Sequence, residues 1–247
     1  MTFRDEILKL AEEEGRLDDF VLTRADFDDY IELLGSGIDP PYIDSSLSFE
    51  LRLVELRLRR AWLWYGFGFG LDQIAAEVFE IARFVLDSDV EHLQDPSRGG
   101  LAYLLRLVGG RDEGFELASR WQPKPEDHPE FVDAILGFDR PDLYPRAAFG
   151  DSATQERTER QYELLDAVRS ESLGIETLVA SYLNDWYGLS RDEKWWESAG
   201  GPNLYYGGYW CFEAAALVAA FEIDDSSFVK NFYYPTDFAN YAKNHQW

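Results

Sequence analysis

The stretch from Gly207 to Phe221 reads GGYWCFEAAALVAAF, and the fold predicted from the sequence depends on it. Between Tyr209 and Phe221 the one charged residue is Glu213, and large apolar side chains alternate with alanine at helical spacing. A helix that is apolar on all sides belongs in the interior of a helical protein, where small alanines let neighbouring helices approach. The run is too short to cross a bilayer. We therefore expect a buried central helix near the C-terminus.

The residues after this helix are typical of caps and turns. The polar segment Asp224–Ser227 can accept hydrogen bonds from the first amides of a short helix that begins at Phe228. Pro235 favours an extended residue before it, and Thr236 then stands at the N-cap position of a last helix over residues 237–244. The acidic pair at the start of the segment could instead bind a metal ion or a basic partner, and capping is the commoner role of such residues.

Apolar residues at steps of three and four predict further helices along the chain, and no strand-like alternation of useful length interrupts them. The expected helices cover residues 3–14, 23–34, 46–65, 71–85, 101–108, 113–121, 130–138, a charged run after a capping box at Ser152, and 175–187. Short loops between successive helices predict an all-α fold of stacked antiparallel hairpins around the central helix.

Two loops between these helices have distinct compositions. Three prolines between Gln122 and Glu130 cannot continue a helix, so we expect an N-terminal helical region over 1–122 and a C-terminal one over 130–247, packed into one body. The glycine-rich spelling GFGFG at Gly66–Gly70 follows a helix and no lysine comes after it, which favours a helix-ending turn over a phosphate loop.

The net charge is the outlier of the composition. The chain has 47 acidic and 23 basic residues, a net charge of -24 at pH 7, and the excess is spread along the whole sequence. Such a surface repels nucleic acid and anionic membranes and attracts basic partners. Acidic composition also keeps a protein soluble, and composition alone leaves both interpretations open. Three arginines of the long third helix, Arg57, Arg59 and Arg60, are expected on a solvated face.

The sequence predicts a cytoplasmic protein. Cys211 is the single cysteine, which excludes an intrachain disulfide, and its place in the apolar helix indicates a small core residue. The N-terminal residues have no apolar segment of the kind that signal peptides carry, and no stretch qualifies as a membrane span.

The sequence contains no strong pattern for catalysis. The three histidines, His92, His128 and His245, lie far apart and show no metal-ligand spacing, so we expect no metal, no cofactor and no catalytic residue. The enzyme alternative is an all-α glycoside-processing protein in which buried carboxylates do acid–base work, with Glu213 as the first candidate. A helical adaptor or scaffold is the other alternative. A carboxylate in the first turn of a helix is more simply explained by the helix dipole, with help from Tyr209 or Trp210.

Three blocks near the C-terminus carry a resemblance to a known family. They are GYW-x-FEAAA at Gly208–Ala216, IDDSS at Ile223–Ser227, and YYP-x-D at Tyr233–Asp237. Their order and spacing resemble the C-terminal signature of the PoNi-type immunity proteins. These neutralise PoNe-type DNase toxins, which bacteria deliver into competitors, as in type VI secretion. The matching residues are Tyr209, Trp210, Glu213, Asp224, Asp225, Ser226, Tyr234, Pro235 and Asp237.

The resemblance implies an all-α protein that binds a DNase toxin and catalyses nothing. The negative charge adds the expectation of a basic partner and of no contact with nucleic acid or membrane. Homo-oligomer formation stays open. Because the matching residues are mainly core and caps, we expect the toxin-binding residues on exposed acidic segments elsewhere. The candidates are Glu126, Asp127, Glu130, Asp133, Asp192, Glu193 and Glu197.

Overall fold

The computed structural model describes residues 29, 32, 48–66, 68–88, 95–120, 130–138, 153–191 and 210–245. Within these residues the helices are joined by turns and loops and there is no strand, so the predicted all-α fold is confirmed. The helices fall into two compact units. The first contains α3 and α4, and the second contains α5 to α11.

The first unit is an antiparallel hairpin of α3 (Phe49–Gly66) and α4 (Leu71–Asp87). Both helices agree with the predicted ranges. Gly68, with φ 87°, closes α3, because its amide and that of Phe69 donate to carbonyls of the last turn. Phe69 stacks on Trp64 with ring centroids 5.4 Å apart. The predicted helix-ending turn is confirmed for these residues.

A buried carboxylate joins the two helices of the first unit. Glu77 of α4 accepts hydrogen bonds from Arg57 Nε at 2.7 Å and from Arg60 Nη2 at 2.8 Å, and all three side chains are largely buried. The expectation that Arg57 and Arg60 lie on a solvated face is therefore wrong. Helical spacing shows that the two arginines share one face of α3, but it does not reveal their partner Glu77, which lies on α4.

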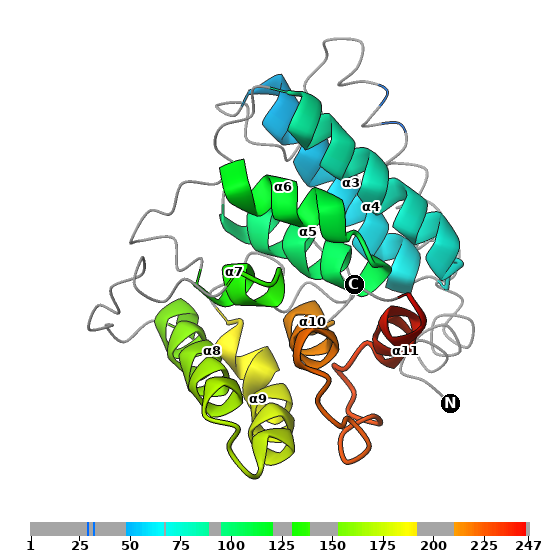
Figure 1. The fold of residues 1–247 in the computed structure, drawn as a ribbon. Coiled ribbons are helices and arrows are strands. Elements are labelled where there is room, and N and C mark those ends of the chain that lie inside the picture. The colour runs from blue at the N-terminus through cyan, green and yellow to red at the C-terminus, as the bar shows by residue number, and fades with distance from the viewer. Residues whose placement is uncertain are drawn as a thin grey trace. The chain divides into compact units, whose positions relative to one another are not determined.

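The second unit is built around α10 (Phe212–Phe221), the predicted central helix. Its neighbours include α5 (Asp95–Val108), α7 (Glu130–Ile135) and α11 (Thr236–Asn244). The residues from Ala214 to Leu217 are fully buried, and Figure 1 shows α10 between α9 and α11. The remaining helices are α6 (Arg111–Arg120) beside α5, and the hairpin of α8 (Ala153–Arg169) and α9 (Ile175–Leu189).

Several helix bounds differ from the sequence prediction. Helix α5 begins at Asp95, six residues before the predicted start, and α7 ends at Ile135, because Gly137 leaves the helical region with φ 86°. The predicted regions 1–122 and 130–247 stay a prediction, and α5 and α6 of the former belong to the second compact unit. The helices predicted over 3–14 and 23–34 lie outside the described residues, apart from helical Asp29 and Glu32.

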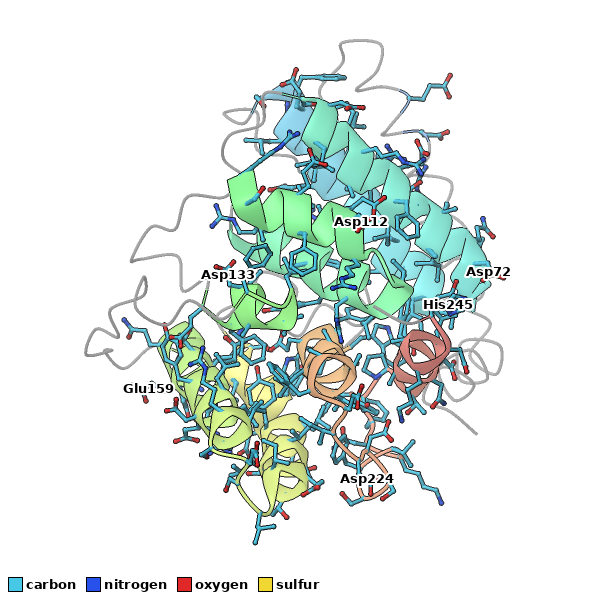
Figure 2. All side chains as sticks on the ribbon, viewed as in Figure 1. Asp72, Asp112, Asp133, Glu159, Asp224 and His245 are labelled. Carbon is cyan, nitrogen blue, oxygen red and sulfur yellow. The ribbon has the colours of Figure 1, made fainter. Side chains whose placement is uncertain are left out.

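Two helix caps predicted for the C-terminal loop are wrong. A turn occupies residues 226–230, where a short helix from Phe228 was expected. Helix α11 does begin at Thr236, but the Thr236 hydroxyl donates to the Val229 carbonyl at 2.6 Å and does not cap the helix. Asp224 does accept local hydrogen bonds, from the amide and hydroxyl of Ser226 at 3.0 Å, which lower the pKa of Asp224. Figure 2 shows Asp224 at the outer tip of this loop.

Candidate functional site

Glu213, the one charged residue of the central helix, is buried and accepts two hydrogen bonds from α9. One of its carboxylate oxygens, Oε1, accepts a short hydrogen bond from the Tyr182 hydroxyl and a second, of 3.1 Å, from the Trp186 indole nitrogen. Both of these donors lie on α9, at 27 and 31 residues' distance in the sequence, and Trp210 Nε1 does not donate to the carboxylate as predicted. The same prediction for Tyr209 falls outside the described residues and stays a prediction.

Further groups of α8 and α10 surround this carboxylate. The Gln161 amide lies 3.4 Å from the Tyr182 hydroxyl and ties α8 to the cluster. Burial, and next the charge of Glu213, raise the pKa of Tyr182 well above its ordinary value and raise that of the Cys211 thiol likewise. Tyr182 therefore stays a neutral donor and Cys211 an un-ionised core residue. The cluster fixes α8, α9 and α10 against one another.

Alkaline pH should weaken the fold through Tyr182. The tyrosine is neutral in both states below about pH 10, while above it the unfolded chain ionises and the folded chain does not. Its contribution is thus fully present below about pH 10 and is lost as the pH rises, by at most about 1.4 kcal/mol per pH unit. Urea unfolding of the wild type and Tyr182→Phe at pH 9, 10 and 11 measures this. A stability difference that does not shrink above pH 10 would contradict it.

Asp225 forms a second buried polar contact, between the C-terminal loop and α11. Its Oδ2 accepts a hydrogen bond of 3.0 Å from the Tyr234 hydroxyl, and its Oδ1 accepts one of 2.8 Å from Lys243. Of the signature residues, Glu213, Asp225 and Tyr234 thus hold elements together, and the predicted helix-capping role of Asp225 is wrong. Tyr209 lies outside the described residues.

The predicted toxin-binding residues divide into two groups. Glu126, Asp127, Asp192, Glu193 and Glu197 lie outside the described residues. Glu130 and Asp133 are described, and the expectation that they are exposed is wrong, since 1% and 2% of their surfaces are accessible. Both lie on the short helix α7, where Glu130 pairs with Arg169 of α8 at 2.5 Å. A toxin contact by these two residues stays a prediction, and their burial does not favour it.

Helix α8 carries an exposed acidic face that the sequence analysis missed. Its members are Glu156, Glu159, Glu163 and Asp166, whose spacings of three, four and three place them on one stripe. Figure 2 shows Glu159 on the side of α8 that points away from α9. The helical periodicity of its charges is visible in the sequence, but the apolar periodicity that predicts the helices does not indicate it.

Arginines of α8 bond to other helices, and one of them, Arg160, also pairs with Glu163 of the stripe. Arg160 donates to Ser181 at 2.9 Å and to Asp185 of α9, as well as to Glu163, and Arg169 turns to α7. Arg157 acts electrostatically on Tyr182 and Cys211 in the interior. Glu156 pairs with Arg191, which follows α9, at 3.3 Å. Although α8 has nearly balanced charges, its outer face is therefore negative.

An aromatic group covers the end of α9. Tyr233 of the C-terminal loop stacks in parallel on Tyr187 of α9, with centroids 5.9 Å apart, and packs edge-on to Phe232. Phe232 is 45% exposed, which is unusual for so large an apolar side chain. Burial and the neighbouring Tyr187 raise the pKa of Tyr233, so that its phenol is neutral. We call Tyr187, Phe232 and Tyr233 the aromatic platform.

The described residues contain no group of three His, Cys, Asp or Glu side chains that could hold a metal ion. Their helices include none that is long and apolar enough to cross a membrane.

Comparison with known proteins identifies one segment of the chain. Residues 142–238 match the family model described as PoNe immunity proteins (PoNi), C-terminal, which confirms the resemblance predicted from the sequence for this segment. No curated protein and no solved structure matches the chain. The matched segment contains α8, α9 and α10, and hence the Glu213 cluster, the acidic face of α8 and the aromatic platform.

Proposed function

We propose that this protein is an immunity protein that binds a cognate PoNe-type DNase toxin in the cytoplasm and blocks it, so that the producing cell survives. The observation that carries the proposal is the match of residues 142–238 to the PoNe immunity proteins. The match includes the central helix and the α8–α9 hairpin, which are the elements that organise the second compact unit. Binding alone accounts for this role, and it requires neither a cofactor nor catalysis by this chain.

The electrostatics of the chain suit this partner. A DNase holds phosphates in a basic groove, and a protein with a net charge of -24 presents the opposite sign. The same charge disfavours direct binding to nucleic acid. Charge complementarity across an interface speeds association and excludes partners of the wrong sign. The acidic excess therefore supports the proposal independently of the family match.

Co-expression tests the proposal. A PoNe-type nuclease domain encoded beside this protein's gene should degrade plasmid DNA when expressed alone and leave it intact when co-expressed with this chain. With purified proteins, addition of one equivalent should stop plasmid nicking and yield a complex in size-exclusion chromatography. Wild-type protein that neither binds nor inhibits that nuclease would overturn the proposal. Hydrolysis of a glycan by the same preparation would favour the glycoside-processing alternative instead.

Salt should affect the two rate constants of binding differently. Exposed charges more than about 8–10 Å apart are screened at physiological ionic strength, while close or desolvated pairs are screened less. We therefore expect the association rate to fall by at least about tenfold between 20 and 300 mM NaCl, and the dissociation rate to change far less. Stopped-flow binding at the two salt concentrations measures both. An association rate that is indifferent to salt would show that the acidic surplus serves solubility only.

A further inference from the structure

We propose that the nuclease is held on one continuous surface of the α8–α9 hairpin, formed by the acidic face of α8 and the aromatic platform. This inference rests on the proposed function and names the surface that performs it. The surface, called the α8–α9 surface below, comprises Glu156, Glu159, Glu163, Asp166, Tyr187, Phe232 and Tyr233. It differs from the exposed segments expected from the sequence, since all of its residues belong to α8, α9 or the C-terminal loop.

Hydrogen bonds connect the two parts of this surface. Arg160 bonds both Glu163 of α8 and Asp185 of α9. The residue of α9 that precedes Asp185, Asn184, accepts a hydrogen bond of 3.0 Å from Asn231, at the base of the platform. Asn231 in turn accepts a hydrogen bond from the Tyr233 amide at 3.0 Å. This series of contacts leads from Glu163 across the exposed Asp185 and Asn184 of α9 to the platform, which is why we assign both parts to one surface.

The platform is held in place before any partner binds. The stack of Tyr233 on Tyr187, the bond between Asn231 and Asn184, and the hydrogen bond from Thr236 to Val229 fix the loop on both sides. Ordering a loop at an interface costs affinity, and this loop needs little ordering. Phe232 projects from it, 45% exposed, as the kind of rigid aromatic anchor that contributes much of the energy in protein interfaces.

The negative charge and the aromatic side chains of this surface together favour a basic protein as its partner. Carboxylates attract arginine and lysine, and the faces of tyrosine and phenylalanine rings bind the same cations within about 6 Å. A basic protein face, such as the DNA-binding side of a nuclease, satisfies both parts of the surface at once. A second copy of this chain would bring a like-charged stripe against α8, and nucleic acid would bring phosphates, so both are disfavoured.

Two substitutions and two matched controls test the surface. Glu163→Lys reverses a carboxylate that is 57% exposed and paired three residues away with Arg160. Its control is Glu80→Lys on α4, also 57% exposed and paired three residues away with Arg83. Both substitutions change the net charge equally, so a difference in binding between the two variants reflects where each residue lies. Phe232→Ser removes the anchor, and Phe49→Ser removes a phenylalanine that is 38% exposed on α3. Circular dichroism and thermal melts establish that each variant is folded.

Binding of the PoNe-type nuclease domain is measured by surface plasmon resonance, with wild-type protein as the reference. We expect Glu163→Lys to raise Kd at least about tenfold, largely through slower association, and Phe232→Ser to raise it at least about tenfold through faster dissociation. The Kd of each control should stay within about threefold of the wild-type value.

If the wild type binds and each variant weakens binding no more than its control does, the proposed α8–α9 surface is wrong. A dimer that Phe232→Ser dissociates would also overturn it. If the wild type does not bind, the proposed function fails instead.

Discussion

Replacing Glu213 with alanine should lower the free energy of unfolding by about 3–5 kcal/mol. The change leaves the Tyr182 hydroxyl and the Trp186 indole N–H without their acceptor in the interior, and it opens a cavity between α9 and α10. Because a domain of this kind is stable by only about 5–15 kcal/mol, the variant should melt far below the wild type. Urea unfolding followed by circular dichroism at 222 nm gives the value.

Glu213→Gln provides the control for this prediction. Glutamine keeps an oxygen where Tyr182 and Trp186 donate, so we expect a loss of about 1–2 kcal/mol, and any loss of toxin protection should accompany that loss of stability. A Tyr182→Phe, Glu213→Gln cycle would measure the coupling between the two side chains. The result that would contradict a structural role is a Glu213→Gln variant with unchanged stability and unchanged toxin binding that has lost a measurable enzymatic turnover.

Breaking the pair between Glu130 and Arg169 should cost about 2–4 kcal/mol, the second largest effect we expect. Arg169→Met removes the cation that pairs with the Glu130 carboxylate, which is 1% exposed. Removing one member of a buried pair is costly because the other charge stays buried. Glu163→Ala is the control, since it breaks an ion pair with Arg160 that is exposed to solvent, and should change stability by less than about 1 kcal/mol.

The same pair distinguishes folding from toxin contact. If Glu130 acts through the fold, Glu130→Gln should lower the melting temperature and leave the dissociation rate of the toxin complex unchanged at temperatures where the variant is fully folded. A faster dissociation rate from a fully folded Glu130→Gln variant would mean that the carboxylate contacts the toxin, as the sequence analysis expected. Thermal melts and stopped-flow measurements at 10 °C supply both readouts.

Helices could be predicted from the sequence where the spacing of apolar residues marks a buried face. Steps of three and four in apolar residues predicted α3, α4 and α9 close to their observed bounds, and the all-round apolar run predicted α10 as the buried centre. The predicted ends of helices were wrong where the apolar pattern does not coincide with the end of the helix. Gly137 ends α7 before its apolar pattern does, and the apolar pattern of α5 starts later than the helix itself.

The roles of charged residues were less predictable. Arg57 and Arg60 belong to a helix face that looks solvated in sequence, and Glu130 and Asp133 follow a polar, proline-rich segment. Each is buried or half-buried, because an element far along the chain covers it. The acidic face of α8 was missed although its spacing is visible in the sequence, since α8 as a whole has almost as many arginines as carboxylates.

The sequence by itself determined the all-α class, the central helix and the likeness to the PoNe immunity proteins, because periodicity and short motifs are local properties that each segment carries alone. Only the tertiary structure decided which charges are buried and which are exposed. Glu213 meets Tyr182 across 31 residues and Glu130 meets Arg169 across 39, and the sequence does not encode such partners by any spacing. Helix packing draws the arginines of α8 inward or sideways and leaves its carboxylates in solvent, so the negative face is a product of the fold.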